Sequence, residues 1–362
     1  MINRFFIINR QKVIENIDII DEHISLKDFR RLHLLRHLPC VFKNQNVNGK
    51  NMDNVSEDYF LSIYGSSKAI LKLGDRVVED VTVGQWFKHA MFNQGWYLKD
   101  FHLNIERPDV KVYNCPEYFQ DDWLNAYFKR DVRPVNDDDD DFQFLYWGKA
   151  DTSSTGVHED VLCSNTWSFN FLGNKVWKIF KNWKSSDGPF IEFVQKPGDV
   201  VFIPGGWYHS VDNVSDCSDS RTTHGSSSTI SVNHNWFNAS SIDLVWDYLS
   251  REELSNVINS LDGYDLNVND KFEYSDLVFK ILKANCSLGI FEFLELIVYG
   301  FEQLLLVERD PNWTRFSFQQ VVLILTDFLD RFVENPVEIV CTDTVAINRC
   351  KLFMEKYKDH FT

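Results

Sequence analysis

The sequence predicts an α+β fold, in which a jelly-roll core of short strands is followed by a bundle of helices. Short segments rich in aromatic and β-branched residues recur between residues 142 and 236, with turn residues between them. Many short strands at near-regular spacing indicate a closed β architecture. From Ile242 onward, apolar residues instead repeat every three or four positions, which is the period of a helix.

The strand segments share a run of four to eight apolar or alternating residues bounded by Gly, Pro, Asn or Asp. They cover residues 142–147, 168–172, 175–180, 191–194, 199–203, 207–211 and 229–236. Because Gly173 and Asn174 separate two of them directly, we expect a hairpin there.

We divide the chain into three parts. Residues 1–90 mix strand and helix signals, residues 91–250 hold the jelly roll, and residues 251–362 are helical. The helical part is expected to buttress the core. A surface for dimerisation or substrate docking is the alternative.

Composition narrows the functional class. The net charge of -16, from 37 basic and 53 acidic residues, argues against a nucleic-acid binder, which would carry a basic surface. It is compatible with a basic protein partner. Seven cysteines without a C-x-x-C spacing indicate a reducing compartment.

The sequence also lacks the pattern of a membrane protein. The first ten residues contain an apolar run too short for a secretory signal. The most apolar later stretch, residues 288–307, carries three glutamates and is therefore expected to be a buried helix. We expect a soluble cytoplasmic protein.

A candidate metal site is formed by His158, Asp160 and His209. Residues i and i+2 of a strand project to one face, so His158 and Asp160 can reach one ion. His209 follows two glycines that allow a tight turn before its strand. Two histidines and one carboxylate with open positions are typical of non-haem Fe(II) oxygenases. For the His-x-Asp triplet alone, a solvated strand end is the alternative.

Other histidines and acidic residues are weaker candidates. His33 and His37 are four residues apart but are expected to be ordinary surface histidines. The acidic run 137–141 is expected to be a solvated loop, because its like charges repel one another and it has no apolar surface to bury. The polar insertion 212–228 is expected to be a mobile loop. His224 within it, and His234, are the substitutes if the metal set is wrong.

Several segments together resemble the jumonji-C family of 2-oxoglutarate- and Fe(II)-dependent oxygenases. They span roughly residues 90–250 and lie at 97–103, 122–125, 158–160, 171–177, 204–209 and 230–238. The resemblance implies a double-stranded β-helix, a cupin-like jelly roll, as the core. Within the family, residues 97–100 and 233–236 resemble the branch that hydroxylates a lysine in the eukaryotic translation termination factor.

The resemblance also implies residues that bind the cofactor 2-oxoglutarate. Lys175 resembles the lysine that pairs with the distal carboxylate, while Thr155 and Tyr97 match family residues that contact the cofactor. The alternative for Lys175 is an edge-strand lysine that faces water. Asn233 stands where many relatives carry a smaller hydroxylated residue.

Polar positions on two predicted strands support this interpretation. Asn233 shares a strand face with Ser231 and Asn235, and Ser168 shares one with Asn170. Polar groups inside a β core need hydrogen-bond partners, which a bound oxo-acid would supply. Three tryptophans are expected either to wall the pocket or to belong to the core: Trp147, Trp207 and Trp236.

Three functions remain open. The favoured one is a protein hydroxylase that uses Fe(II), 2-oxoglutarate and O2 and acts on a lysine of a termination factor. An N-methyl-lysine or arginine demethylase would need the same residues. A catalytically silent binding scaffold is disfavoured, because a decayed site is expected to have lost at least one of them.

Overall fold

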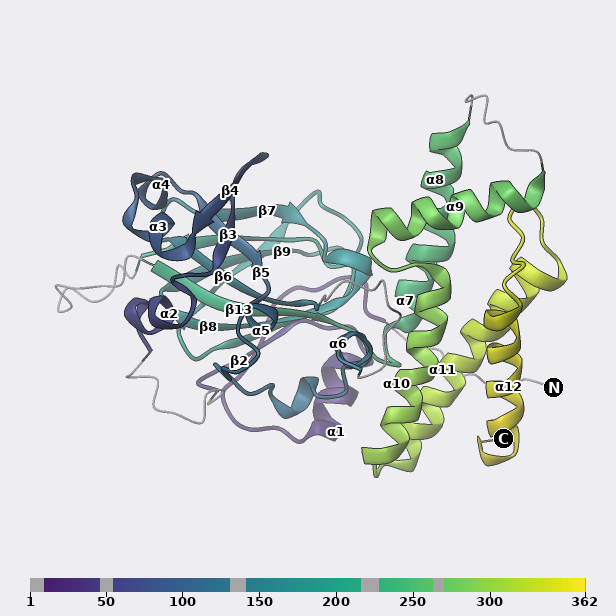
Figure 1. Ribbon diagram of the computed structural model, residues 1–362. Coiled ribbons are helices and arrows are strands. Elements are labelled where there is room, and N and C mark those ends of the chain that lie inside the picture. Colours follow the sequence, from purple (N-terminus) through teal and green to yellow (C-terminus); the bar gives the residue numbers. More distant parts are fainter. Residues whose placement is uncertain (1–9, 46–54, 131–140, 216–227, 263–269, 362) are drawn as a thin grey trace.

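A β core and a helical region lie side by side in the computed structural model (Figure 1). The structure describes residues 10–45, 55–130, 141–215, 228–262 and 270–361. No helix in these segments is long and apolar enough to cross a bilayer. The predicted α+β class, with a jelly-roll core before the C-terminal helices, is confirmed.

The core consists of two sheets. The larger has nine strands in the order β1-β2-β11-β8-β13-β6-β5-β3-β4, and the smaller has four in the order β10-β9-β12-β7. Along the chain, the strands of the jelly roll alternate between the two sheets, except that β9 and β10 are consecutive and pair with each other in the smaller sheet. They are β6 (Gln143–Lys149), β7 (Ser154–His158), β8 (Asn165–Leu172), β9 (Asn174–Phe180), β10 (Phe190–Gln195), β11 (Val200–Ile203), β12 (His209–Val214) and β13 (Ser228–Trp236).

The residues before the jelly roll extend the same large sheet at both of its ends. Two early strands continue it beyond β11, and three continue it beyond β6. These are β1 (Asp18–Ile20), β2 (Cys40–Phe42), β3 (Lys68–Leu73), β4 (Arg76–Thr82) and β5 (Tyr97–Phe101). The predicted boundary at residue 90 between the N-terminal part and the jelly roll therefore remains a proposal.

Short helices connect these early strands. They are α1 (Leu26–Phe29), the π-helical turn η1 (Arg30–Leu34), α2 (Glu57–Tyr64), α3 (Val83–Lys88), α4 (Ala90–Asn93), α5 (Leu103–Glu106), the 3-10 turn η3 (Glu117–Phe119) and α6 (Trp123–Phe128). A further 3-10 turn, η4 (Val161–Cys163), follows β7.

The predicted hairpin at Gly173 is wrong. Strand β8 pairs with β11 and β13 in the large sheet, whereas β9 pairs with β10 and β12 in the small sheet. The chain therefore crosses between the sheets at Gly173, whose φ of 67° is one that glycine adopts easily. A Cβ there would also lie 2.6 Å from the carbonyl oxygen of Ser228. The crossing places Lys175 opposite the large sheet.

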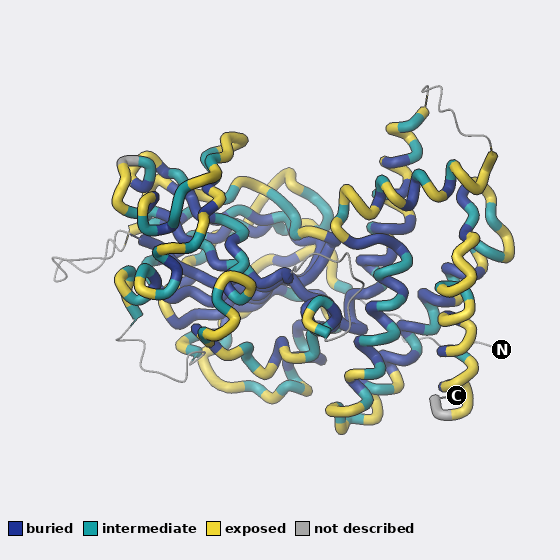
Figure 2. The backbone as a smooth tube through the Cα atoms, viewed as in Figure 1, coloured by how far each residue is buried: buried dark blue, intermediate teal, exposed yellow. Residues whose placement is uncertain are grey.

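Two apolar clusters hold the fold together, and Figure 2 shows the buried backbone running through the middle of both halves. A small cluster that includes Trp177, Trp207 and Val211 lies between the sheets. A larger one joins the outer side of the large sheet to the helices and includes Trp147 and Trp236. Trp147, Trp207 and Trp236 are all core residues.

The helical region follows β13 directly. It comprises α7 (Ile242–Asp247), the π-helical segment η5 (Tyr248–Glu253), α8 (Leu254–Leu261), α9 (Lys271–Cys286), α10 (Ile290–Val307), α11 (Pro311–Leu329), the π-helical turn η6 (Asp330–Glu334) and α12 (Thr344–Phe361). Helix α10 packs on α6, where the Tyr127 hydroxyl donates to Glu295 Oε2 at 2.8 Å. Arg30 pairs with Glu308 at 2.6 Å and ties the N-terminal part to these helices.

Two expectations about exposed residues are wrong. His33 and His37 are buried, with 4% and 1% of their surface exposed, because the turn that carries them packs against the core. Asp141 is also buried and accepts from His102, whose Nδ1 lies 3.0 Å from Asp141 Oδ1. The rest of the acidic run, 137–140, lies outside the described residues, as do His224 and residues 216–227 of the polar insertion.

Candidate active site

Three side chains meet where β7 and β12 run antiparallel. His209 pairs in register with His158, and the two imidazole rings lie 4.4 Å apart between centroids. Asp160 follows the end of β7 in an extended conformation, with φ of −70° and ψ of 150°, so it keeps the i, i+2 relationship. One ligand atom from each of the three lies within 4.8 Å of the others. One ion could contact all three side chains.

Both imidazoles are oriented by the backbone. His158 Nδ1 lies 2.8 Å from the carbonyl oxygen of Gly156, and His209 Nδ1 lies 2.9 Å from that of Trp207. A ring nitrogen beside a carbonyl oxygen must donate, which places the proton on Nδ1 and leaves a lone pair on Nε2. This is the tautomer that can bind a metal through Nε2. Burial lowers the pKa of His209 to about 4, so its imidazole is neutral.

The turn before His209 is fixed by close packing. A Cβ on Gly205 would lie 2.0 Å from the carbonyl oxygen of Cys163, and Gly206 has a φ of 79°. The Gly205 carbonyl oxygen accepts from Trp183 Nε1 at 3.0 Å and lies 2.5 Å from His37 Nε2. His37, which the sequence placed on the surface, therefore braces the turn that positions His209.

Lys175 reaches across the space between the sheets. Its fully buried ammonium group donates to the hydroxyl of Ser231 on β13. Within the described residues, no carboxylate pairs with this ammonium group, and burial together with nearby Lys99 lowers the Lys175 pKa to about 7. A buried ammonium group among neutral polar groups is costly to keep charged unless an anion neutralises it.

The polar residues predicted on neighbouring strands surround this lysine. Ser168 Oγ donates to Asn233 Oδ1 at 2.8 Å, and Ser231 Oγ lies 3.4 Å from the same oxygen. Asn233 lines the cavity, whereas Ser168 lies behind it and holds its side chain. The amide nitrogen of Asn233 is thereby turned away from Ser168.

One cavity joins the three candidate ligands to the predicted cofactor residues. Tyr97, Thr155, Lys175 and Asn233 line it together with His158, Asp160 and His209. Tyr97 is buried on β5, and this burial raises the pKa of its phenol. Of the predicted site residues, Ser168 alone does not contact the cavity.

Sequence reasoning missed part of the lining. Tyr146, Thr166, Trp177, Val211 and Asn235 also line the cavity, although Asn235 was placed on the polar face of its strand. Tyr146 lies opposite Ser231 in the sheet, and its ring is 5.6 Å from Lys175 Nζ. Its hydroxyl donates to Asp100 Oδ1 at 2.5 Å, and Asp100 pairs in turn with Lys72. The alternation of β6 would have indicated Tyr146 once the pairing with β13 was known.

These residues fit a metal ion and a dianionic oxo-acid. The donor set offers two imidazole nitrogens and one carboxylate on one side of the ion. Lys175 supplies a buried cation, and Tyr97, Thr155 and Asn233 supply hydroxyl and amide groups next to it. The fold and the site together define the class of jelly-roll proteins with a two-histidine, one-carboxylate metal centre.

Comparison with known proteins indicates which jelly-roll proteins this chain resembles. The family model described as "JmjC domain, hydroxylase" matches residues 181–224, which include His209. The chain is 27% identical over 341 residues to the chicken "2-oxoglutarate and iron-dependent oxygenase JMJD4", with 78% of this chain and 74% of that protein aligned. For the human protein of the same name, the identity is 26% over 370 residues, covering 86% and 83%. The chain is therefore similar to JmjC-domain oxygenases over most of its length.

A plant relative carries a different name. The Arabidopsis thaliana "Arginine-specific demethylase JMJ20" is 30% identical over 298 residues, which cover 67% of this chain and 61% of that protein. The chain thus spans less than two thirds of the plant protein. Both names occur among relatives of similar identity, so the family alone does not decide the substrate.

Proposed function

We propose that this protein is an Fe(II)- and 2-oxoglutarate-dependent protein hydroxylase. The observation that carries the proposal is the convergence of His158, Asp160 and His209 on one point, in the same cavity as the buried ammonium group of Lys175. Relatives named as 2-oxoglutarate and iron-dependent oxygenases support it. A binding scaffold would have no need to keep this arrangement intact.

Each residue has a distinct role in the proposal. His158 and His209 bind Fe(II) through Nε2 and Asp160 binds it through a carboxylate oxygen, while Lys175 pairs with the distal carboxylate of 2-oxoglutarate. Tyr97, Thr155 and Asn233 donate to or orient the cofactor, and Ser168 fixes Asn233. Together the bound groups supply hydroxylation chemistry, in which O2 and 2-oxoglutarate yield succinate, CO2 and one oxygen atom on a substrate carbon.

Charge balance supports this assignment. The carboxylate of Asp160 and the two carboxylates of 2-oxoglutarate carry three negative charges. Fe(II) and the Lys175 ammonium group carry three positive ones. A buried site with no net charge avoids the large desolvation penalty of an uncompensated ion.

We propose that the substrate is a lysine side-chain carbon of a cytoplasmic translation termination factor. The support is the resemblance of residues 97–100 and 233–236 to that branch and the similarity to proteins named JMJD4. Demethylation of arginine or lysine is the second candidate, because the plant relative is named an arginine-specific demethylase.

One experiment separates the two. The protein, loaded with Fe(II), is given purified termination factor and methylated histone peptides in parallel with 2-oxoglutarate, and both are read by mass spectrometry. A gain of one oxygen on a termination-factor lysine supports the hydroxylase. Loss of methyl groups from the peptides, with the termination factor unchanged, supports the demethylase instead.

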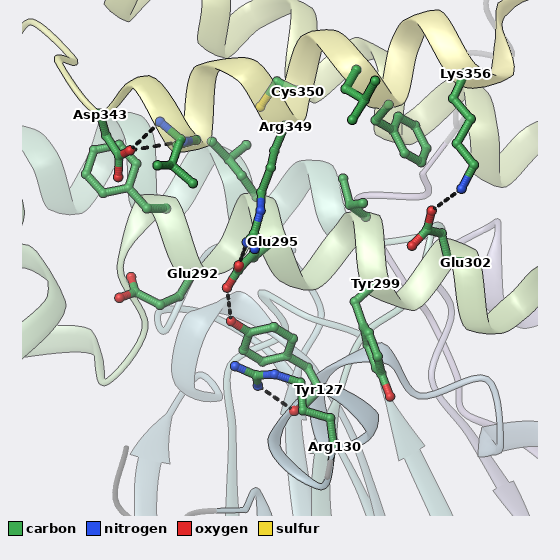
Figure 3. Close-up of a pocket in the computed structure, with 17 residues that line it drawn as sticks. Tyr127, Arg130, Glu292, Glu295, Tyr299, Glu302, Asp343, Arg349, Cys350 and Lys356 are labelled. Carbon is green, nitrogen blue, oxygen red and sulfur yellow. Dashed lines mark hydrogen bonds and ion pairs between the residues drawn. The ribbon is translucent and has the colours of Figure 1, made fainter. Parts of the chain in front are cut away.

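We also propose that the C-terminal helices form a homodimer contact. Figure 3 shows a groove between α10 and α12, which is also lined by Tyr127 of α6 and by Arg130. Within it Glu302 pairs with Lys356 at 2.8 Å, whereas Leu352 is 69% exposed on α12. Light scattering of the wild type and of Leu352→Glu tests this, since a dimer held here should dissociate in the variant.

A further inference from the structure

A second cavity lies between the β core and the helical region. On the core side it is lined by Phe144 of β6 and by Val161 of η4, with His102 and Asp141 at one end. On the helical side it is lined by Tyr248 of η5 and by Asn285 and Cys286 at the end of α9. None of the residues assigned above to the metal or the cofactor lines this cavity.

The cavity nevertheless borders the metal site along two walls. Val161 directly follows Asp160, so the residue after a proposed metal ligand forms part of its lining. Phe144 lies opposite Asn233 in the sheet, and Tyr146 lies opposite Ser231, so both project to the same face of β6. Residues two apart on a strand are separated by about 7 Å. A long side chain entering from this cavity could therefore span the distance to the space beside Tyr146.

The chemistry of the walls favours a basic and partly apolar occupant. Phe144, Val161 and Leu162 supply apolar contact, and no lysine or arginine of the described segments lines the cavity. Asn285 donates to Glu253 Oε1 at 2.9 Å, so a carboxylate is in contact with one of the lining residues. The neighbouring Glu252 is more than half exposed, and its carboxylate lies 3.9 Å from Lys184 Nζ. Complementary charge selects a partner and speeds its association.

We propose that this cavity binds a basic segment of the protein substrate in extended form and admits its target side chain past Val161 to the metal. This inference rests on the proposed hydroxylase function. It assigns Asn285 and Glu253, far along the chain from the metal site, to substrate binding. The helical region then contributes to recognition as well as to stability.

A tryptophan at position 285 would fill the cavity from the exposed end of α9. The matched control is Ala284→Trp, because residue 284 is also exposed on α9 but does not line the cavity. The probe is a fluorescein-labelled decapeptide rich in lysine, and its twin has glutamate in place of lysine. Binding is measured by fluorescence anisotropy, so the readout does not depend on turnover.

The wild type and Ala284→Trp should bind the lysine peptide and not the glutamate twin. Asn285→Trp should weaken binding by about tenfold or more, as for the loss of a central interface contact. Glu253→Lys should also weaken it, whereas Glu355→Lys, on the exposed face of α12, should not. Equal binding by Asn285→Trp and Ala284→Trp, or no binding by the wild type, would overturn the inference.

Turnover is then measured separately with termination factor. If the cavity variants lose peptide binding while no protein tested becomes hydroxylated by the wild type, the proposed function fails and the binding cavity stands. If the wild type hydroxylates termination factor and Asn285→Trp does so with an unchanged KM, the hydroxylase stands and this inference fails.

Discussion

The ammonium group of Lys175 on the small sheet donates to the hydroxyl of Ser231 on the large sheet. This contact crosses the interior of the jelly roll and leaves a buried cation without a carboxylate partner among the described residues. Such a group is costly to bury unless an anion neutralises it. The same strand, β9, carries Lys178, which is half-buried and pairs with Asp212 at 3.6 Å. We therefore expect different effects on 2-oxoglutarate binding when each of these two lysines is replaced.

Lys175→Ala should weaken 2-oxoglutarate binding by tenfold to a hundredfold, because loss of a charge-assisted hydrogen bond costs about 1.5–3 kcal/mol. Lys178→Ala should leave the Kd unchanged within a factor of about two, since its ion pair is partly exposed. Calorimetry on the metal-loaded protein measures both. An unchanged Kd in Lys175→Ala would move the role to Tyr97 or Asn233.

Asp160→Ala should abolish tight iron binding and 2-oxoglutarate turnover, because it removes the carboxylate of the proposed ligand set. Asp212→Ala is the matched control: it removes an equal charge from β12, three residues after His209, at a partly exposed position. Iron content by atomic absorption and succinate formation are the readouts. Full succinate production by Asp160→Ala would refute the assignment of the metal site.

The metal set could be predicted because its determinants are local in sequence. The spacing of His158 and Asp160 and the glycine turn before His209 are visible in the chain itself. Periodicity likewise located the strands and the C-terminal helices. Periodicity does not predict which strands pair with each other. Gly173 would turn the chain equally well in a hairpin or in a crossing between sheets, and the pairing of β9 with β10 and β12 decides which one forms.

Burial of polar residues depends on contacts between distant parts of the chain. His37 contacts the carbonyl oxygen of Gly205, which is 168 positions away, and no local sequence pattern predicts that contact. Asp141 ends an acidic run whose composition indicates solvent exposure, yet it is buried beside His102. Tyr146 escaped notice because its place in the cavity follows from its pairing with Ser231 on β13.

Binding of 2-oxoglutarate should take up a proton at Lys175. In the free protein, burial lowers the Lys175 pKa to about 7, and Lys99 adds to the effect. A bound carboxylate stabilises the charged form and raises this pKa, so affinity should fall as pH rises above about 7. Calorimetry at pH 7.5 in phosphate and in Tris should give different enthalpies, because the buffers release protons with different heats.

Lys175→Arg provides the control for that prediction, since a guanidinium group stays charged at these pH values. Its binding enthalpy should not depend on the buffer, whatever its affinity. Buffer-independent enthalpies for the wild type would show that Lys175 is already charged before the cofactor binds.

His37 should make the protein less stable in acid. Burial lowers its pKa from 6.5 to about 3, so the folded state keeps the imidazole neutral where the unfolded state binds a proton. The stabilising contribution is complete above pH 6.5 and falls as pH drops toward 3. At pH 5 the loss for this one residue is about 2 kcal/mol, since each pKa unit corresponds to about 1.4 kcal/mol. The free energy of unfolding in urea should therefore differ less between pH 7 and pH 5 for His37→Gln than for the wild type.

His23→Gln is the control, because it removes a histidine whose side chain is 72% exposed, and it should behave as the wild type does. If His37→Gln kept the full acid sensitivity of the wild type, the loss would have to come from the other buried histidines, such as His234.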